Sequence, residues 1–149
     1  MQAKDIMTTE VVTVTPEDTV EEVVKIISER GISGIPVVDA SGKLVGIVSE
    51  GDIITRSKNL QIPTHIQLLG GVIYLESTKK LESDLRKMVA FQVKDLMTSK
   101  VFTVSSEAPV AEIATIMTEE QVNRIPVVEN GKVVGIVSRA DIVRTLIKQ

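Results

Sequence analysis

The chain has 149 residues, of which 43% are hydrophobic and only 2% aromatic, and its formal net charge is −3. A mildly acidic chain with so few aromatic side chains is poorly suited to nucleic acid, because it lacks both backbone-binding charge and stacking platforms. It contains no cysteine and one histidine, which excludes disulfides and thiolate metal sites and argues against histidine-based catalysis. We therefore expect no nucleic-acid partner, no metal and no catalytic residues.

No leader pattern opens the chain, and its longest apolar run, over 68–75, is far too short to cross a bilayer. We expect a cytoplasmic protein that does not engage a membrane.

In chain order, the first predicted element is a strand over 11–14, a β-branched run bounded by polar residues. A helix follows, with a capping signal at Thr19 and a terminating glycine at Gly31. Two further strands flank a tight turn, and a second helix follows them; these elements are predicted over 35–38, over 44–48 and from Ser49.

The stretch 58–92 has no counterpart elsewhere in the chain. It holds the apolar run over 68–75 and then a charged segment over 77–88, in and just after which Leu81, Leu85, Met88 and Val89 recur at helical spacing. We interpret it as an insert that packs on the rest of the module or on a partner chain.

The elements before the insert are then predicted a second time. A strand over 101–104 leads to a helix entered through Pro109, and Asn130-Gly131 marks a type I′ hairpin between two more strands. The last helix begins at Ser138. Gln121 stands where the first copy has its terminating glycine, so the end of this helix is less sharply defined by the sequence.

The order of elements repeats because the sequence repeats. Lys4-Asp5-Ile6-Met7-Thr8 returns as Lys94-Asp95-Leu96-Met97-Thr98, a spacing of 94 − 4 = 90 that becomes 89 after Asn130. A half of about 55 residues would be marginal alone, so we expect the two copies to share a core and to form paired sites. The predicted organisation is a first repeat over 1–57, the insert over 58–92 and a second repeat over 93–149.

With this pattern assembled, the chain resembles a tandem pair of cystathionine-β-synthase (CBS) domains, the arrangement called a Bateman module. The resemblance covers everything except the insert. The residues that carry it are Asp5-Ile6-Met7-Thr8, Ile35-Pro36-Val37-Val38, Gly42 to Ser49 and Asp52-Ile53, together with their second copies.

The resemblance implies a mixed α/β (α+β) fold with two β-α-β-β-α repeats packed about a pseudo-two-fold axis. It also implies a non-catalytic regulatory module with no required cofactor. Such a module binds an adenosine-containing ligand, namely AMP, ADP, ATP or S-adenosylmethionine, in clefts between the repeats and signals by conformational change. Family members commonly pair as homodimers, and an effector protein outside this chain is then expected to receive the signal.

In the family, the ribose-binding residue is the Asp of a Gly-x-x-Ser/Thr-x-x-Asp motif, which maps here onto Asp52 and Asp141 with Ser49 and Ser138 before them. The chemistry agrees, because an ionised carboxylate only accepts hydrogen bonds and is suited to the two hydroxyls of a ribose.

By the same analogy, each cleft joins the Asp of one copy to the residues before the Ile-Pro pair of the other. The expected ligand-binding residues of one cleft are Asp52, Ser49, Asn123 and Arg124. Those of its twin are Asp141, Ser138, Ser33, Gly34 and Thr8. Val12, Ile35 or Ile125 can sandwich an adenine in the absence of aromatics. Pro36 and Pro126 are counted with the ligand-binding residues, although we expect their own role to be mainly structural. Since Arg124 is a fixed cation and Ser33-Gly34 is uncharged, we expect the second cleft to prefer a less phosphorylated ligand or to stay empty.

Three simpler interpretations remain open. Ser-x-x-Asp at a helix start is also an ordinary capping box, and Arg124 can equally pair with a surface acid such as Glu120. The whole module can also be a structural dimerisation scaffold whose clefts are vestigial. Ligand binding separates this scaffold from a sensor.

Overall fold

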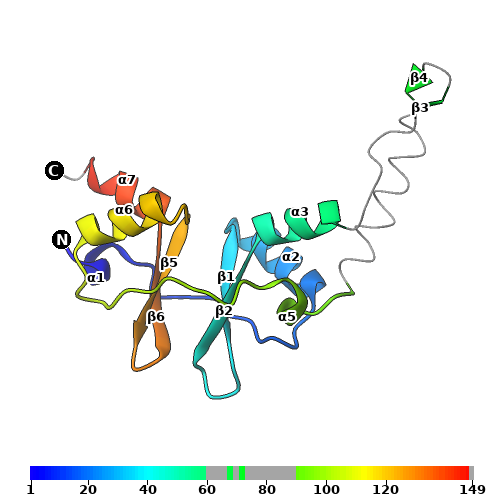
Figure 1. The fold of residues 1–149 in the computed structure, drawn as a ribbon. Coiled ribbons are helices and arrows are strands. Elements are labelled where there is room, and N and C mark those ends of the chain that lie inside the picture. Colours follow the sequence, from blue (N-terminus) through cyan, green and yellow to red (C-terminus); the bar gives the residue numbers. More distant parts are fainter. Residues whose placement is uncertain (60–66, 69–70, 73–89, 148–149) are drawn as a thin grey trace. The chain divides into compact units, whose positions relative to one another are not determined.

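The computed structural model describes residues 1–59, 67–68, 71–72 and 90–147, and Figure 1 shows the elements that they form. The chain divides into two compact units. The first unit comprises Met1–Thr15, Pro36–Ile47 and Thr98–Gln149, and the second unit comprises Pro16–Ile35 and Val48–Met97. Both units therefore mix residues from the two sequence copies.

Each sequence copy contains three helices and two strands. In the first copy these are α1 (Ala3–Ile6), α2 (Val20–Arg30), β1 (Gly34–Val38), β2 (Leu44–Ser49) and α3 (Glu50–Asn59). In the second they are α5 (Val93–Leu96), α6 (Val110–Glu119), β5 (Arg124–Glu129), β6 (Lys132–Ser138) and α7 (Arg139–Thr145). Between the copies, β3 (Gln67–Leu68) pairs antiparallel with β4 (Gly71–Val72). The helix predicted over 77–88 lies outside the described residues.

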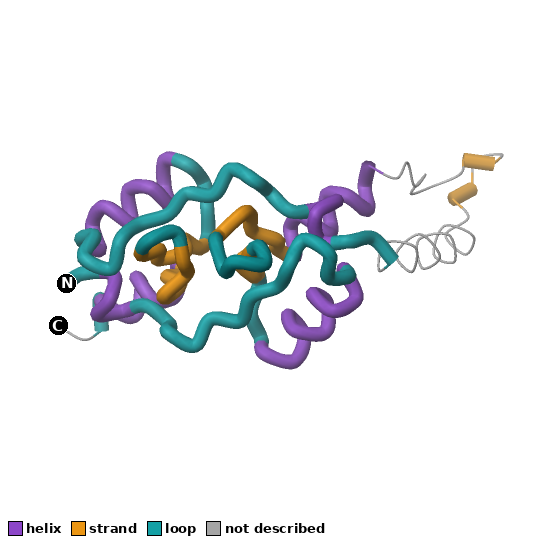
Figure 2. Tube along the Cα trace, turned by 90° about the horizontal axis from the view of Figure 1, so that it is seen from below, coloured by secondary structure: helices purple, strands orange, loops and turns teal. Residues whose placement is uncertain are grey.

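The mixed fold class is confirmed. In the unit that carries both chain termini, helices lie to the outside of the strands (Figure 2). The strands β5 and β6 form an antiparallel hairpin in which Arg124 lies opposite Ser138 and Glu129 opposite Lys132. The predicted type I′ turn is confirmed, because Asn130 and Gly131 have φ of 51° and 79°. None of the helices with described placement is long and apolar enough to cross a membrane.

The strands predicted at the start of each copy, over 11–14 and 101–104, are wrong in extent. Each shrinks to one parallel bridge, Val14 with Val37 and Val104 with Val127. Val14 N–H donates to Pro36 O at 3.1 Å, and Val38 N–H donates to Val14 O at 2.9 Å. The next bond of a parallel ladder would need an N–H on residue 36, which proline lacks. The Ile-Pro pair therefore ends the ladder, and the same holds for Pro126.

The helix boundaries follow the predicted caps, but the residue that ends α6 in the left-handed conformation is a glutamine and not a glycine. Thr19 accepts a hydrogen bond from Glu22 N–H at 3.3 Å, and Gly31 ends α2 in the left-handed region with φ of 63°. In the second copy Gln121 adopts the same conformation, with φ of 53°. A side chain in that region costs about 1–2 kcal/mol relative to glycine.

The short helix α1 belongs to the first sequence copy but packs in a core made by the second. Ala3 is fully buried, its N–H donates to Ala108 O at 2.8 Å, and Lys4 N–H donates to Ser106 O at 2.9 Å. The other buried members of this core are Val104, Ala108, Ile113, Met117, Ile125, Val127 and Val137. Neither this helix nor its counterpart α5 was predicted from the sequence.

The helix α5 makes the reciprocal arrangement in the second unit. Val93 N–H donates to Asp18 O at 2.8 Å and Lys94 N–H donates to Pro16 O at 2.9 Å, while Leu96 packs with Val20. The opening segment of each copy is thus anchored to the other copy. Each compact unit contains residues of both sequence copies. The boundaries at 57 and 93 therefore describe the sequence repeat and not the compact units, and they stay a prediction.

Candidate ligand-binding site

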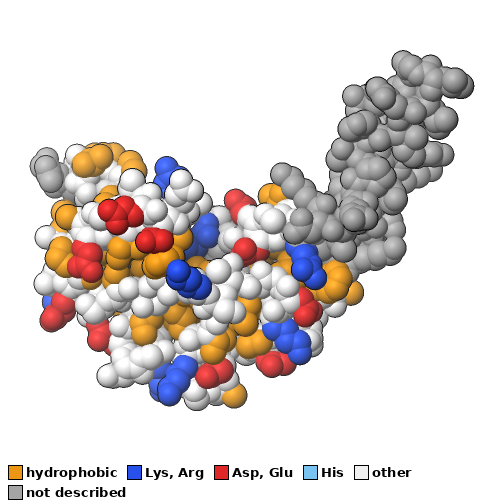
Figure 3. Space-filling model, viewed as in Figure 1, with side chains coloured by type: hydrophobic (Ala, Val, Ile, Leu, Met, Phe, Trp, Pro, Cys, Tyr) orange, Lys and Arg blue, Asp and Glu red, His pale blue; other side chains and the backbone are white. Residues whose placement is uncertain are grey.

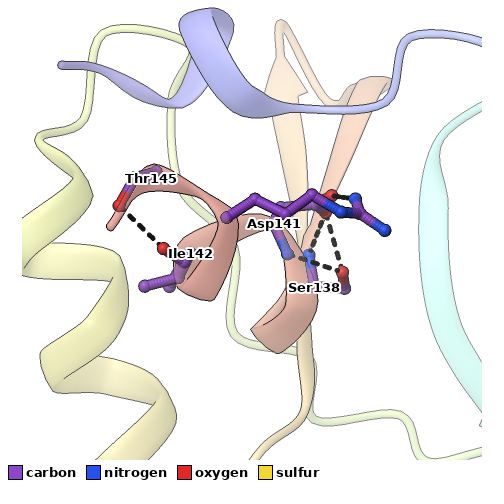
Figure 4. Close-up of polar contacts among 5 residues, drawn as sticks. Ser138, Asp141, Ile142 and Thr145 are labelled. Carbon is purple, nitrogen blue, oxygen red and sulfur yellow. Dashed lines mark hydrogen bonds and ion pairs between the residues drawn. The ribbon is translucent and has the colours of Figure 1, made fainter. Parts of the chain in front are cut away.

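The carboxylate of Asp141 is held at the start of α7 by Ser138. Its Oδ2 accepts from Ser138 N–H at 2.7 Å and from the Ser138 hydroxyl at 2.8 Å, and Ser138 Oγ lies 3.3 Å from Asp141 N (Figure 4). These contacts form a capping box, so the simpler interpretation of the Ser-x-x-Asp motif is confirmed. The box uses one carboxylate oxygen and fixes the direction of the other.

The first copy repeats this geometry in the second unit. Asp52 Oδ2 accepts from Ser49 N–H at 2.8 Å and from the Ser49 hydroxyl at 3.0 Å, and Asp52 N–H donates to Ser49 Oγ at 3.3 Å. Both carboxylates are therefore pre-oriented by the same two donors. Capping and ligand binding are compatible, because a carboxylate has about four acceptor positions and the box occupies two.

Around Asp141 the structure adds a residue that the sequence analysis did not single out. Arg144 Nη1 lies 2.9 Å from Asp141 Oδ1, and the Arg144 side chain is 68% exposed while that of Asp141 is only 11% exposed. The first copy has Thr55 at the corresponding position (144 − 89 = 55). A search for cations three residues after each motif Asp, on the same helix face, would have found Arg144.

The segment before the Ile-Pro pair is tied to the start of the following helix in both copies. Arg139 N–H donates to Asn123 O at 3.0 Å, and in the second unit Glu50 N–H donates to Ser33 O at 3.0 Å. The Arg139 guanidinium also donates to Asn123 Oδ1 at 3.2 Å. Within each unit, the expected pre-proline residue and the expected Ser-x-x-Asp motif are therefore brought together.

Two more expected residues of the first unit lie beside this motif. Arg124 is the register partner of Ser138, and Thr8 pairs with Ile136 through Thr8 N–H to Ile136 O at 2.9 Å and Ile136 N–H to Thr8 O at 3.0 Å. Thr8 thus forms one antiparallel bridge with β6 two residues before Ser138, and from there the chain runs away from the start of α7.

The apolar residues expected at the ligand sites differ in accessibility. Val12 is half-buried, while Ile35, Pro36, Ile125 and Pro126 are buried and Ile125 belongs to the core of the first unit. Gly34 begins β1 beside Ser33. Contact of these side chains with a ligand stays a prediction.

The predicted clefts combine residues of different units. Asp52 lies in the second unit while Asn123 and Arg124 lie in the first, and Asp141 lies in the first unit while Ser33 lies in the second. Their combination in one site therefore also stays a prediction. Among the residues that the structure describes, no group of three His, Asp or Glu side chains could hold a metal ion.

The sequence and fold place the chain in one family. The model of the CBS domain matches residues 3–59 and 93–148, which is more than half of the chain, so this protein belongs to the CBS-domain family. A protein of Methanocaldococcus jannaschii, MJ1426, is 33% identical over 157 residues, an alignment that covers 99% of this chain and 92% of that protein.

Two solved CBS-pair structures share the fold. The structure of CBSX2 in complex with AMP matches with a TM-score of 0.73 and 27% identity, over 99% of this chain and 96% of that one. The CBS domain pair of MJ0100 in complex with 5′-methylthioadenosine and S-adenosyl-L-methionine matches with a TM-score of 0.73 and 26% identity, over 98% and 99%. Chloroplastic CBSX1 of Arabidopsis thaliana is 31% identical over 91% of this chain, which spans 58% of that relative.

Proposed function

We propose that this protein is a non-catalytic regulatory module that binds an adenosine-containing ligand through its two Ser-x-x-Asp motifs. The observation that carries the proposal is the repeated geometry of Ser49–Asp52 and Ser138–Asp141, in which the cap holds one carboxylate oxygen and orients the other. An acceptor fixed in this way is suited to the hydroxyls of a ribose. The adenosine compounds bound by CBSX2 and MJ0100, at 26–27% identity, support the same ligand class.

The two sites differ in charge within their own units, which supports unequal ligand preferences. Arg144 pairs with Asp141, whereas Thr55 and Glu50 stand at the first-copy positions of Arg144 and Arg139. A ribose at Asp141 therefore competes with a guanidinium for Oδ1, whereas the first copy has a threonine instead of this arginine. The charge of Arg124 remains the feature expected to favour phosphate in the cleft of Asp52.

Thermal unfolding with a ligand panel tests the proposal. AMP, ADP, ATP and S-adenosylmethionine are each added to the parent protein at about 100 times the expected Kd, where one bound ligand contributes about 2.7 kcal/mol. For a chain of this size the melting temperature should rise by several degrees. Absence of a shift with all four would favour the alternative function, a scaffold with vestigial clefts.

We propose in addition that the protein acts as a homodimer. The end of α7 and the residues after it present large hydrophobic side chains, Val143 at 58%, Leu146 at 74% and Ile147 at 82% exposure. Figure 3 shows hydrophobic atoms gathered over this helix. Light scattering of the parent and of a Val143→Ser/Leu146→Ser variant should give a dimer and a monomer respectively.

A ligand signal then needs a receiver, and we propose an effector protein that reads the ligand-bound arrangement. Such transmission requires the ligand to bind one arrangement more tightly than another. Hydrogen exchange of the two units with and without the ligand measures this directly, because a ligand that only binds protects its site and leaves the rest of each unit unchanged.

A further inference from the structure

A pocket of about 310 Å³ lies within the first unit, between the end of α6 and the start of α7. Its volume is at the lower end of the range of small-molecule sites. Ser138 and Asp141 do not line the pocket, but it adjoins their motif, because Arg139 directly follows Ser138 and Asn123 is an expected ligand-binding residue. Its lining residues are Met117, Thr118, Gln121, Val122, Asn123 and Arg139.

One side of the pocket offers a directed cation. Arg139 donates one N–H to Asn123 Oδ1 at 3.2 Å, and its backbone N–H donates to Asn123 O at 3.0 Å. The side-chain bond engages one N–H of the exposed guanidinium, which has five N–H donors in total and can bind a carboxylate in a bidentate manner.

Other lining residues offer hydrogen-bond acceptors. The hydroxyl of Thr118 donates to Ala114 O at 2.9 Å, and because this uses its only proton, the oxygen can only accept from a ligand. Met117 and Thr118 belong to the last turn of α6, so the pocket lies at the negative end of this helix dipole. A purely anionic ligand would meet this end unfavourably, whereas a ligand with an ammonium group would meet it favourably.

The conformation of Gln121 is a further, independent observation. It holds φ of 53° at the helix end, where the first copy has Gly31 at 63°. A left-handed non-glycine residue is strained, and such strain concentrates at ligand-binding sites. Gln121 also lines the pocket, so its side-chain amide is a further polar group of this site.

The first copy lacks this combination of charges. The residues at the positions of Thr118, Gln121 and Arg139 are Ser28, Gly31 and Glu50 (118 − 90, 121 − 90 and 139 − 89). An acidic residue therefore replaces the cation, and a glycine replaces the side-chain amide. The pocket chemistry is specific to the second copy.

We propose that this pocket binds a zwitterionic α-amino-acid group, with the carboxylate on Arg139 and the ammonium group on Thr118 Oγ1 and the carbonyl end of α6. Met117 and Val122 supply apolar contact for the side chain of the amino acid. The group can be a free amino acid or the amino-acid end of an adenosine compound. The inference stands without the proposed function in the first case and deepens it in the second.

Calorimetric titration separates these sources. L-methionine tests the free amino acid. S-adenosylhomocysteine and 5′-methylthioadenosine test the tethered group, because they share the thioether and adenosine and differ in the amino-acid moiety. If the pocket binds the free amino acid, loss of a charge-assisted hydrogen bond in Arg139→Gln should lower the affinity for methionine about ten- to a hundredfold. If it binds the tethered group, the parent should prefer S-adenosylhomocysteine over 5′-methylthioadenosine by about the same factor, and Arg139→Gln should abolish this preference.

Two variants complete the experiment. Lys132→Gln removes the same charge from the far end of β6 and should change nothing. Gln121→Gly should raise the melting temperature by about 3 °C while it weakens binding, so that its loss of affinity cannot be ascribed to unfolding.

The proposal is overturned if methionine does not bind and the ratio of the two adenosine compounds is the same in parent and Arg139→Gln. It is equally overturned if methionine binds but keeps its affinity in Arg139→Gln. If methionine binds through Arg139 while no adenosine compound binds, this inference stands and the proposed function fails. If adenosine compounds bind equally well to the parent and to Arg139→Gln while methionine does not bind, the proposed function stands and this inference fails.

Discussion

The side chain of Met7 lies directly against the backbone of Gly135. A Cβ on Gly135 would approach Met7 Cγ to 2.8 Å and Met7 Cβ to 3.2 Å, and the Met7 sulfur also occupies this space. Met7 follows α1 and Gly135 lies in β6, so this contact holds the opening segment of the first copy on the second. Only glycine permits such an approach without displacing the segment.

We expect Gly135→Ala to destabilise the protein by about 1–3 kcal/mol, because atoms near the root of a side chain cannot move aside cheaply. Chemical denaturation of the parent and the variant measures this loss. Met7→Ala in the same background should restore part of it. If the effects of the two substitutions on the free energy of unfolding are strictly additive, the contact between Met7 and Gly135 is not the cause of the loss.

Replacement of glycine by alanine should have opposite effects at Gly31, which ends α2, and at Gly51, which lies in the first turn of α3. Gly31→Ala should cost about 1 kcal/mol through its backbone alone, since no atom lies within 4 Å of the added Cβ. Gly51→Ala is the matched control: its Cβ meets only Ser49 Oγ at 3.5 Å, and the second copy has Ala140 there. This variant should gain about 0.5–1 kcal/mol. Equal melting temperatures for the two variants would show that the left-handed conformation of Gly31 does not require glycine.

A carboxylate contact near the α1 anchor predicts a pH dependence. Hydrogen bonds from the Ser106 hydroxyl and then from the Ser106 backbone N–H hold the pKa of Glu129 below its ordinary 4.5. A lowered folded-state pKa stabilises the protein above the unfolded value, and this contribution is lost as the pH falls through the folded pKa. The stability gap between parent and Glu129→Gln should therefore be constant from pH 7 to about 5 and shrink below 4.5.

Glu10→Gln removes one carboxylate without touching Ser106 and serves as the control. Melting curves at pH 7, 5, 4 and 3 are sufficient. A gap that widens on acidification would show that the sign of the Glu129 contribution is opposite to the one expected from its hydrogen bonds.

Removal of Arg144 tests its competition with a ribose. The pair with Asp141 is largely exposed on the arginine side, so Arg144→Gln should change stability by less than about 1 kcal/mol. An uncharged adenosine ligand at Asp141 should then bind up to about fivefold more tightly and with weaker salt dependence. A tenfold loss of affinity, measured by calorimetry, would show instead that Arg144 contacts the ligand.

Local signals in the sequence predicted the caps and turns correctly. Asn130-Gly131, Thr19 and Gly31 each determine the structure of their own immediate neighbours, and each was found where expected. The opening strands were predicted too long because β-branched residues indicate a strand but do not show whether the adjacent strand can pair with all of it. The missing N–H of Pro36 and Pro126 decides how far that strand can pair.

The short helices and the exchange of opening segments were not predictable in this way. A four-residue helix shows no periodicity, and the burial of Ala3 against Ile113 and Val127 depends on residues about a hundred positions away. The Ser-x-x-Asp motifs were predictable because their hydrogen bonds are local. Arg144 was missed although its spacing of three residues from Asp141 on α7 is a local signal. The pocket around Arg139 depends on how helix ends meet, which composition and spacing do not determine.

Ribose binding by the motif carboxylates is tested most directly by one calorimetric cycle. AMP and 2′-deoxy-AMP are titrated into the parent, Asp52→Asn and Asp141→Asn; asparagine keeps an oxygen for the serine cap but places an amide group where the second acceptor was. At an occupied site, the substitution should weaken AMP about ten- to a hundredfold and 2′-deoxy-AMP much less, because the lost partner is the 2′-hydroxyl. Equal losses for both nucleotides, or no loss in either variant, would contradict ribose binding by these residues.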